Sequence, residues 1–250
     1  MNKMSDPIPL EKLKLNLERI HMRMGEAAAK ASRPLSAIKL VAVTKYVTLH
    51  EIEALIQLGV RDFGESRVQD AEQKIKALPP AHAAATLNWH LIGHLQTNKA
   101  DKAAALFQTI HSVDSDRVAA ALNKEAAKRL AKGAATEPIT CLLEVNVAHE
   151  ANKFGLKPES DEIETLLKKC AEMPAIRIVG LMAMAPYAEN PEPTSRPVFQ
   201  KLHELFQQAN ASGWYPYRLT ELSMGMTQDY HIGIEEGATL IRVGSALFEQ

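Results

Sequence analysis

Apolar residues in this chain gather in short runs, and stretches with helical periodicity separate these runs. The first run, residues 38–45 (IKLVAVTK), is continuous and rich in β-branched side chains. Such a run is typical of a strand that is buried on both faces of a parallel sheet. The same pattern predicts further strands at residues 62–65, 88–93, 108–113, 139–146, 177–184, 219–222 and 239–243.

Helical periodicity fills the intervals between these strands. Helices are predicted at residues 48–59, 66–78, 97–106, 114–131, 159–171, a segment that ends at residue 211, and 228–236. Thr48 and Glu51 have the spacing of a capping box at the start of the first of these helices, and Asp114 is expected to cap the fourth. An amphipathic helix at residues 8–30 precedes the first strand.

Strict alternation of eight strands with helices predicts a closed (β/α)8 TIM barrel. The last strand is followed by too few residues for an outer helix, so the N-terminal helix is expected to take that place. An open doubly wound sheet is the alternative, but it would need a glycine-rich turn after the first strand. The turn here is Thr44-Lys45-Tyr46. No linker interrupts the pattern, so residues 1–250 are predicted to form a single domain.

Composition narrows the functional class. The 29 basic and 30 acidic residues nearly cancel, and no basic run interleaved with aromatics indicates a nucleic-acid partner. No apolar stretch approaches the length of a membrane span or a secretory signal. Cys141 and Cys170 have neither metal nor redox spacing and are expected to be reduced packing residues. A cytoplasmic enzyme or binding protein is therefore predicted.

The candidate chemistry lies where the predicted strands end, because barrel active sites are built at the carboxyl ends of the strands. Ser223-Met224 follows the seventh strand and Gly244-Ser245 follows the eighth, and small residues after such strands favour a phosphate cradle. Lys45 ends the first strand. It is either a lysine that forms a Schiff base with a carbonyl compound or a lysine that is ion-paired at a strand end, with Glu65 as a candidate partner.

Six segments carry a resemblance to a known family. They are VAVTK, FGESRVQD, WHLIGHLQTNK, NVAHEANKFGL, GLMAMAP and SMGMTQDYHIGIEEGATLIRVGSALF, in that order along residues 40–248. The chain resembles the pyridoxal phosphate homeostasis protein family, whose fold is similar to the N-terminal barrel of alanine racemase. The resemblance implies that Lys45 carries pyridoxal 5'-phosphate, a vitamin B6 cofactor, as a Schiff base. It also implies that Arg242 faces the pyridine nitrogen.

Nine residues are predicted to contact the cofactor. They are Lys45, Ser66, His90, Met182, Ser223, Met224, Arg242, Gly244 and Ser245. Two positions depart from the family pattern. Ser66 stands where many members have asparagine, and Val47 stands where some members have a second lysine, which removes one candidate for transfer of the cofactor between lysines.

The expected role is to buffer or deliver the cofactor to apoenzymes, with little or no turnover. Arginine can only donate hydrogen bonds, so the pyridine nitrogen is expected to stay unprotonated and carbanions to be poorly stabilised. Alanine racemase takes a second acid/base from a partner subunit's additional domain, which this sequence is expected to lack. Tyr46, Tyr187 and Tyr230 are possible substitutes or ordinary loop aromatics. A monomer is expected.

Three other interpretations stay open. The first is a pyridoxal-phosphate-dependent amino-acid racemase or a related enzyme. The second is a metal-dependent hydrolase on a barrel that uses His90, His94 and His111. The third is an interaction scaffold that uses the methionines at residues 182, 184, 224 and 226, although thioethers that line a barrel interior explain these better. Lys153 is either a solvated loop charge or a secondary lysine for the cofactor.

Overall fold

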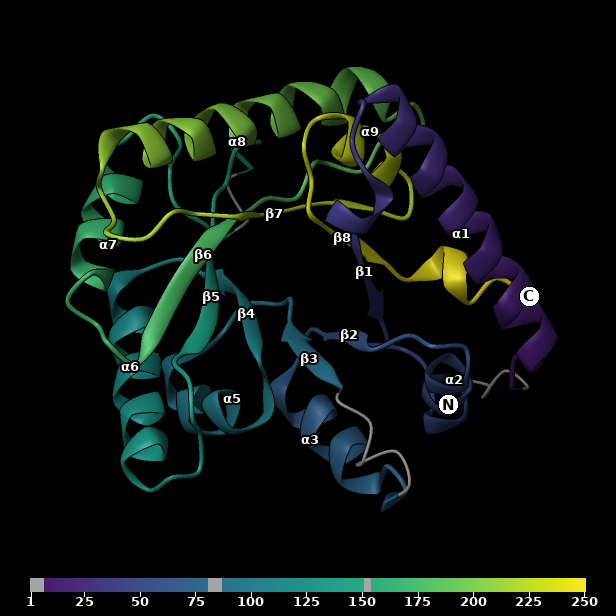
Figure 1. Ribbon diagram of the computed structural model, residues 1–250, viewed down its shortest axis with the longest axis horizontal. Helices are drawn as coiled ribbons and strands as arrows, with labels where there is room; N and C mark the ends of the chain where they lie inside the picture. Colours follow the sequence, from purple (N-terminus) through teal and green to yellow (C-terminus); the bar gives the residue numbers. More distant parts are fainter. Residues whose placement is uncertain (1–6, 81–86, 151–153) are drawn as a thin grey trace.

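The computed structural model describes residues 7–80, 87–150 and 154–250. Eight parallel strands form a closed barrel in sequence order (Figure 1). The strands are β1 Lys39–Val43, β2 Asp62–Glu65, β3 Asn88–Leu91, β4 Thr109–Val113, β5 Ile139–Glu144, β6 Ile176–Met182, β7 Glu221–Met226 and β8 Leu240–Val243. Pairing of β1 with β8, in which Val41 lies opposite Arg242, closes the barrel and confirms the predicted fold class.

Helices surround this barrel. They are α1 Leu10–Lys30, α2 Leu49–Gln57, α3 Val68–Ala77, α5 Ala100–Leu106, α6 Asp116–Ala131, α7 Glu162–Cys170, α8 Glu192–Ser212 and α9 Tyr230–Glu235, with short 3-10 turns η1 Leu35–Ala37, η2 Thr97–Lys99 and η3 Ser245–Leu247. Within the described part of the chain, no helix has the length and apolar character that crossing a membrane requires.

Helix α1 lies where an eighth outer helix would be expected, as predicted. It packs alongside α9 and the end of the chain (Figure 1). Its buried Asn16 donates hydrogen bonds from Nδ2 to the carbonyl oxygens of Leu247 and Glu249. Arg33, which follows the helix, donates to the carbonyl of Ile234. The bonds from Asn16 fasten the segment after β8, and with it the candidate phosphate cradle, against the N-terminal helix, and the bond from Arg33 fastens α9.

The turn after β1 is fixed from both sides. Val47 N donates to Thr44 O at 3.1 Å, which ends the strand and places Lys45 in the turn. Helix α2 then begins with the predicted capping box, in which Thr48 N donates to Glu51 Oε2 at 2.9 Å. A capping box satisfies backbone N–H groups that the first helical turn leaves unpaired. The position of Lys45 is therefore set by local sequence.

Several predicted boundaries differ from the structure by a few residues, and two of these differences concern a candidate site residue or a predicted cap. Strand β7 does not end at Leu222 but continues to Met226, because residues 223–226 pair with the neighbouring strands: Ser223 lies opposite Met182 and Met226 lies opposite Arg242. Helix α6 is capped at Ser115 rather than at Asp114. The first difference matters for the site, since it moves Ser223 and Met224 from a loop into the barrel wall.

Both cysteines are free and buried, as predicted. Burial raises the pKa of Cys170 to about 12 and raises that of Cys141 as well. Thiols in this state are weak nucleophiles at neutral pH. They are packing residues of the outer core.

Candidate functional site

Lys45 lies exposed at the carboxyl end of the barrel. Its Nζ is 5.0 Å from the centre of the Tyr46 ring. Glu65, the possible ion-pair partner, is engaged elsewhere: its Oε1 accepts hydrogen bonds from Lys74 Nζ at 2.8 Å and from Thr44 Oγ1 at 2.6 Å. The structure therefore assigns the buried ion pair to Lys74 and not to Lys45.

The same Lys74 also holds the backbone that precedes Lys45. Its Nζ donates to Thr44 O at 2.6 Å in addition to its bond to Glu65. Helix α3 is thus tied to the ends of both β1 and β2. Because Glu65 is paired with Lys74, it does not hold the amine of Lys45, which a lysine that reacts with a carbonyl must keep available.

Arg242 is the central charge of the barrel interior. It is only 3% exposed, and it donates from Nη1 to Ser223 Oγ and from Nη2 to Ala183 O. Burial lowers the pKa of its guanidinium to about 10, while the carboxylates of Asp229 and Glu144 act in the opposite direction. The group therefore stays cationic at neutral pH.

Ser223 and Met224 do not line the mouth with their side chains. The hydroxyl of Ser223 is buried between Arg242 and His111, and its Oγ lies 2.8 Å from His111 Nδ1. The side chain of Met224 is buried in the main core cluster. The structure therefore places Ser223 behind Arg242, and it leaves Met224 only its backbone with which to contact a ligand at the mouth.

An oxygen already occupies a cradle of backbone N–H groups after β8. Gly244 N and Ala246 N both donate to Thr227 Oγ1, at 3.3 and 3.5 Å. Ser245 lies exposed between these two donors, at the start of η3. N–H donors that converge on one oxygen are the donor set that a phosphate requires. Thr227 is not among the residues predicted from sequence, although its hydroxyl follows β7 as that of Ser245 follows β8.

Asp229 holds the turn after β7 and is also absent from the sequence prediction. Its buried carboxylate accepts hydrogen bonds from Met226 N at 2.7 Å and from Ser195 Oγ at 2.8 Å. Glycine is needed at position 225, near the end of β7, because its φ is +93° and an added Cβ would lie 2.8 Å from Tyr230 Cα. These contacts determine where Thr227 meets the cradle.

The remaining predicted contacts lie at different distances from the carboxyl end of the barrel. Ser66 lies half-buried in the turn after β2, packed so closely that a Cβ on Gly93 would lie 2.3 Å from its carbonyl oxygen. Met182 packs inside the barrel with Val41, Leu142 and Leu240. His90 lies further from the mouth, since it contacts His111 and Asp62 and lines a cavity of about 360 Å³ at the opposite end of the barrel.

The three histidines considered for a metal site are divided between two environments. His90 and His111 are hydrogen-bonded to each other, whereas His94 Nδ1 lies 3.2 Å from Asp114 Oδ2 and its ring stacks on Phe154 at 3.6 Å. Among the residues that the structure describes, no group of three or more His, Cys, Asp or Glu side chains is placed to hold a metal ion. Lys153 lies outside the described residues.

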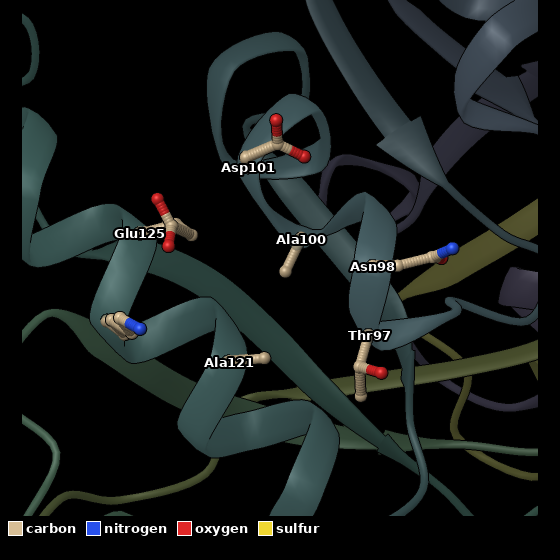
Figure 2. Close-up of a pocket in the computed structure, with 7 residues that line it drawn as sticks. Thr97, Asn98, Ala100, Asp101, Ala121 and Glu125 are labelled. Carbon is tan, nitrogen blue, oxygen red and sulfur yellow. The ribbon is translucent and has the colours of Figure 1, made fainter.

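A second cavity lies in the outer helical layer. It has a volume of about 290 Å³, and Figure 2 shows Thr97 and Asn98 of η2 and Asp101 of α5 around it, together with Ala121 and Glu125 of α6. None of the predicted cofactor contacts lines it. The candidate site is therefore the carboxyl end of the barrel, where Lys45, Arg242 and the cradle after β8 occur together.

This chain is similar to known proteins in sequence and in structure. Residues 9–250 match the family model described as the alanine racemase N-terminal domain. A pyridoxal phosphate homeostasis protein of Aquifex aeolicus is 37% identical over 232 residues, which cover 93% of this chain and 95% of that protein.

Two solved structures are also similar. An unknown protein from Bifidobacterium adolescentis superposes with a TM-score of 0.86 at 32% identity, covering 99% of this chain and all of that one. PipY of Synechococcus elongatus, solved with pyridoxal phosphate bound, gives a TM-score of 0.71 at 34% identity and covers 92% of this chain and 99% of that one.

Proposed function

Because the chain belongs to the pyridoxal phosphate homeostasis protein family, on the alanine racemase N-terminal fold, we propose that it binds pyridoxal phosphate as a Schiff base on Lys45. The protein then buffers the cofactor inside the cell and delivers it to apoenzymes, as a single domain with little or no turnover. The observation that carries this proposal is the meeting of Lys45, Arg242 and the backbone cradle after β8 at one end of the barrel.

The residues present fit this cofactor. Lys45 offers an amine that forms no ion pair with a carboxylate of the described residues. Gly244 and Ala246 offer N–H donors for the phosphate, and Ser245 adds a hydroxyl beside them. When bound, the cofactor supplies an aldehyde that condenses with an amine and a ring that can withdraw electrons.

Arg242 supports the proposal of low turnover. A carboxylate beside the pyridine nitrogen would accept a hydrogen bond from the protonated nitrogen and so favour a protonated ring, which withdraws electrons strongly. Arg242 is a donor only, and it is cationic and buried. A donor at this place favours an unprotonated nitrogen, so the site binds the cofactor without making it a strong electron acceptor.

The tyrosines do not offer an obvious second acid/base. Tyr230 is buried on α9, where the guanidinium of Arg23 lies 5.5 Å from its ring centre. Tyr46 and Tyr187 are 89% and 84% exposed. Side chains this exposed are not held by surrounding groups in the fixed geometry that a general acid/base needs.

The competing function is racemisation of an amino acid, and one experiment separates the two. The loaded protein is incubated with each common L-amino acid in turn, and D-enantiomer formation is followed beside transfer of the cofactor to an added apoenzyme. We expect transfer without measurable racemisation, with the Lys45→Ala protein as the blank. Racemisation at an ordinary enzymatic rate of about 1 per second or faster would overturn the proposed role.

Thr227→Val tests the phosphate cradle. The substitution keeps the shape of the side chain but removes the oxygen that meets Gly244 N and Ala246 N, so a bound phosphate loses a neighbouring hydroxyl. We expect affinity for pyridoxal phosphate to fall about tenfold, with affinity for unphosphorylated pyridoxal nearly unchanged. Equilibrium titration with both compounds measures this ratio. An equal loss for the two would place the phosphate elsewhere.

A further inference from the structure

Five polar side chains cross the barrel interior in an unbroken series of hydrogen bonds. Arg242 Nη1 contacts Ser223 Oγ. Ser223 Oγ lies 2.8 Å from His111 Nδ1, His111 Nε2 lies 2.9 Å from His90 Nδ1, and His90 Nε2 lies 3.0 Å from Asp62 Oδ1. The series starts near the candidate cofactor site and ends at the cavity on the opposite side of the barrel.

The arginine end of the series determines which way the first protons point. A guanidinium has donors and no acceptor, so Ser223 Oγ accepts from Arg242. The hydroxyl proton of Ser223 is then left for His111 Nδ1, which must be unprotonated to accept it. Neutral His111 therefore carries its proton on Nε2 and donates to His90.

The aspartate end leads to the same direction. Burial opposes ionisation of Asp62, but hydrogen bonds from His90 and Asn88 lower its pKa, so the carboxylate is an acceptor at neutral pH. His90 consequently donates from Nε2 to Asp62, and its Nδ1 is bare to accept from His111. If the direction were reversed, the bare Nε2 of a neutral His90 would face the carboxylate of Asp62. Protonation of the two histidines would instead place positive charge beside Arg242 and leave the Ser223 proton without its acceptor.

We infer that Arg242, Ser223, His111, His90 and Asp62 form one directed chain in which every proton is donated toward Asp62. This chain positions the guanidinium of Arg242 toward the cofactor. Ser223 and His111 are positioning residues, because Ser223 contacts Arg242, His111 contacts Ser223, and neither side chain lies at the mouth. The inference takes the identity of the ligand from the proposed function, but the direction of the hydrogen bonds does not depend on that function.

Electrostatics agree with a neutral His111. It is fully buried, and desolvation lowers its pKa well below the ordinary value, as does repulsion from Arg242 and from a protonated His90. Two of the five guanidinium N–H groups are committed, one to Ser223 Oγ and one to Ala183 O. A guanidinium fixed at two points has its remaining donors aimed in one direction. The chain thus explains why two histidines occupy the inside of the barrel.

The direction is tested on the cofactor-free protein. Nitrogen-15 NMR of labelled histidine distinguishes a bare ring nitrogen from a protonated one. At pH 7 we expect His90 and His111 both to be neutral, with the proton on Nε2 and Nδ1 bare. A proton on Nδ1 of either ring would overturn the direction, whether or not the protein binds pyridoxal phosphate.

The positioning role is tested with a matched pair of serines. Ser223→Ala removes a link of the chain, whereas Ser112→Ala removes another buried hydroxyl beside His111, one that donates to Gly93 O at 2.7 Å and lies outside the chain. We expect Ser223→Ala to weaken binding of pyridoxal phosphate about tenfold, to change the absorption maximum of the bound cofactor and to shift the Nδ1 resonances of His90 and His111. Ser112→Ala should leave affinity within about twofold and the absorption maximum unchanged.

The possible outcomes separate the two proposals. If the wild type takes up no pyridoxal phosphate, the proposed function fails, but the NMR result still decides the direction of the hydrogen-bond chain. If the wild type binds and both serine variants behave alike, the cofactor stands and the positioning role is refuted. A change of affinity, absorption and imidazole resonances in Ser223→Ala alone supports the inference.

Discussion

Replacement of Lys45 with alanine is expected to abolish covalent attachment of pyridoxal phosphate and to leave the barrel folded. The side chain is exposed, and its described contact is with the ring of the exposed Tyr46. Removal of such a side chain changes the free energy of unfolding by about 0.5 kcal/mol or less. Loss of the amine, in contrast, removes the group that condenses with the aldehyde.

The visible absorption of the purified protein measures this effect. Wild type should show a yellow band that borohydride bleaches, and Lys45→Ala should lack it. Lys39→Ala is the matched control, because Lys39 begins the same strand and lines the cavity at the opposite end of the barrel. Mass spectrometry of the reduced wild type should find the adduct on the peptide that contains Lys45. A band that persists in Lys45→Ala and disappears in Lys39→Ala would place the cofactor site at the opposite end of the barrel and contradict the proposal.

The fold was predictable because its strands, helices and caps can each be recognised from a short stretch of sequence. Continuous β-branched runs identify strands that are buried on both faces, and their alternation with amphipathic helices leaves few topologies. The capping box at Thr48 and Glu51 is read directly from the spacing and appears as predicted. The position of α1, beside α9 and η3, also agrees with the prediction. The strand that presents Lys45 is thereby fixed as well.

Depth within the barrel was not predictable in the same way. Alternation shows which residues point inward, but the register between strands determines how far each lies from the mouth. The register of β7 shifts between Ser223 and Met226, and that of β6 shifts beside Cys141 and Leu142. Ser223 therefore lies behind Arg242. His90 lies near the opposite opening, where it is paired with Thr109 at the start of β4. Neither shift is visible in the hydrophobic pattern.

Thr227 and Asp229 were overlooked for a related reason. Both follow a strand whose end is predicted at Leu222, so Thr227 falls in the predicted loop and Asp229 in the next predicted helical segment. Their roles depend on bonds to the backbone after β8 and to Ser195 on α8, which are distant in sequence. A hydroxyl or carboxyl group after a strand is a common loop residue, and only the three-dimensional contacts distinguish these two.

Arg242→Leu is expected to reduce both stability and cofactor binding strongly. The guanidinium is buried, so its loss leaves Ser223 Oγ and Ala183 O without their donor and removes a cation that faces Asp229 and Glu144. Breaking a buried charge interaction in this way costs about 3–5 kcal/mol. That is a large part of the 5–15 kcal/mol by which a typical domain is stable. Guanidinium chloride unfolding measures the change.

Arg177→Leu is the control, because it makes the same chemical change at an exposed position of the barrel wall. Arg177 is exposed on β6, where its guanidinium lies 4.3 Å from the centre of the Tyr217 ring. We expect its loss to cost about 1 kcal/mol or less and to leave affinity for pyridoxal phosphate unchanged.

Arg242→Lys adds an intermediate case. It keeps the charge but not the planar fork that reaches Ser223 and Ala183 together, so it should retain more stability than the leucine variant and still bind the cofactor weakly. If Arg242→Leu were as stable as Arg177→Leu and bound pyridoxal phosphate with wild-type affinity, the guanidinium would be neither the interior's organising charge nor a cofactor contact. The low turnover attributed to it would then need another cause.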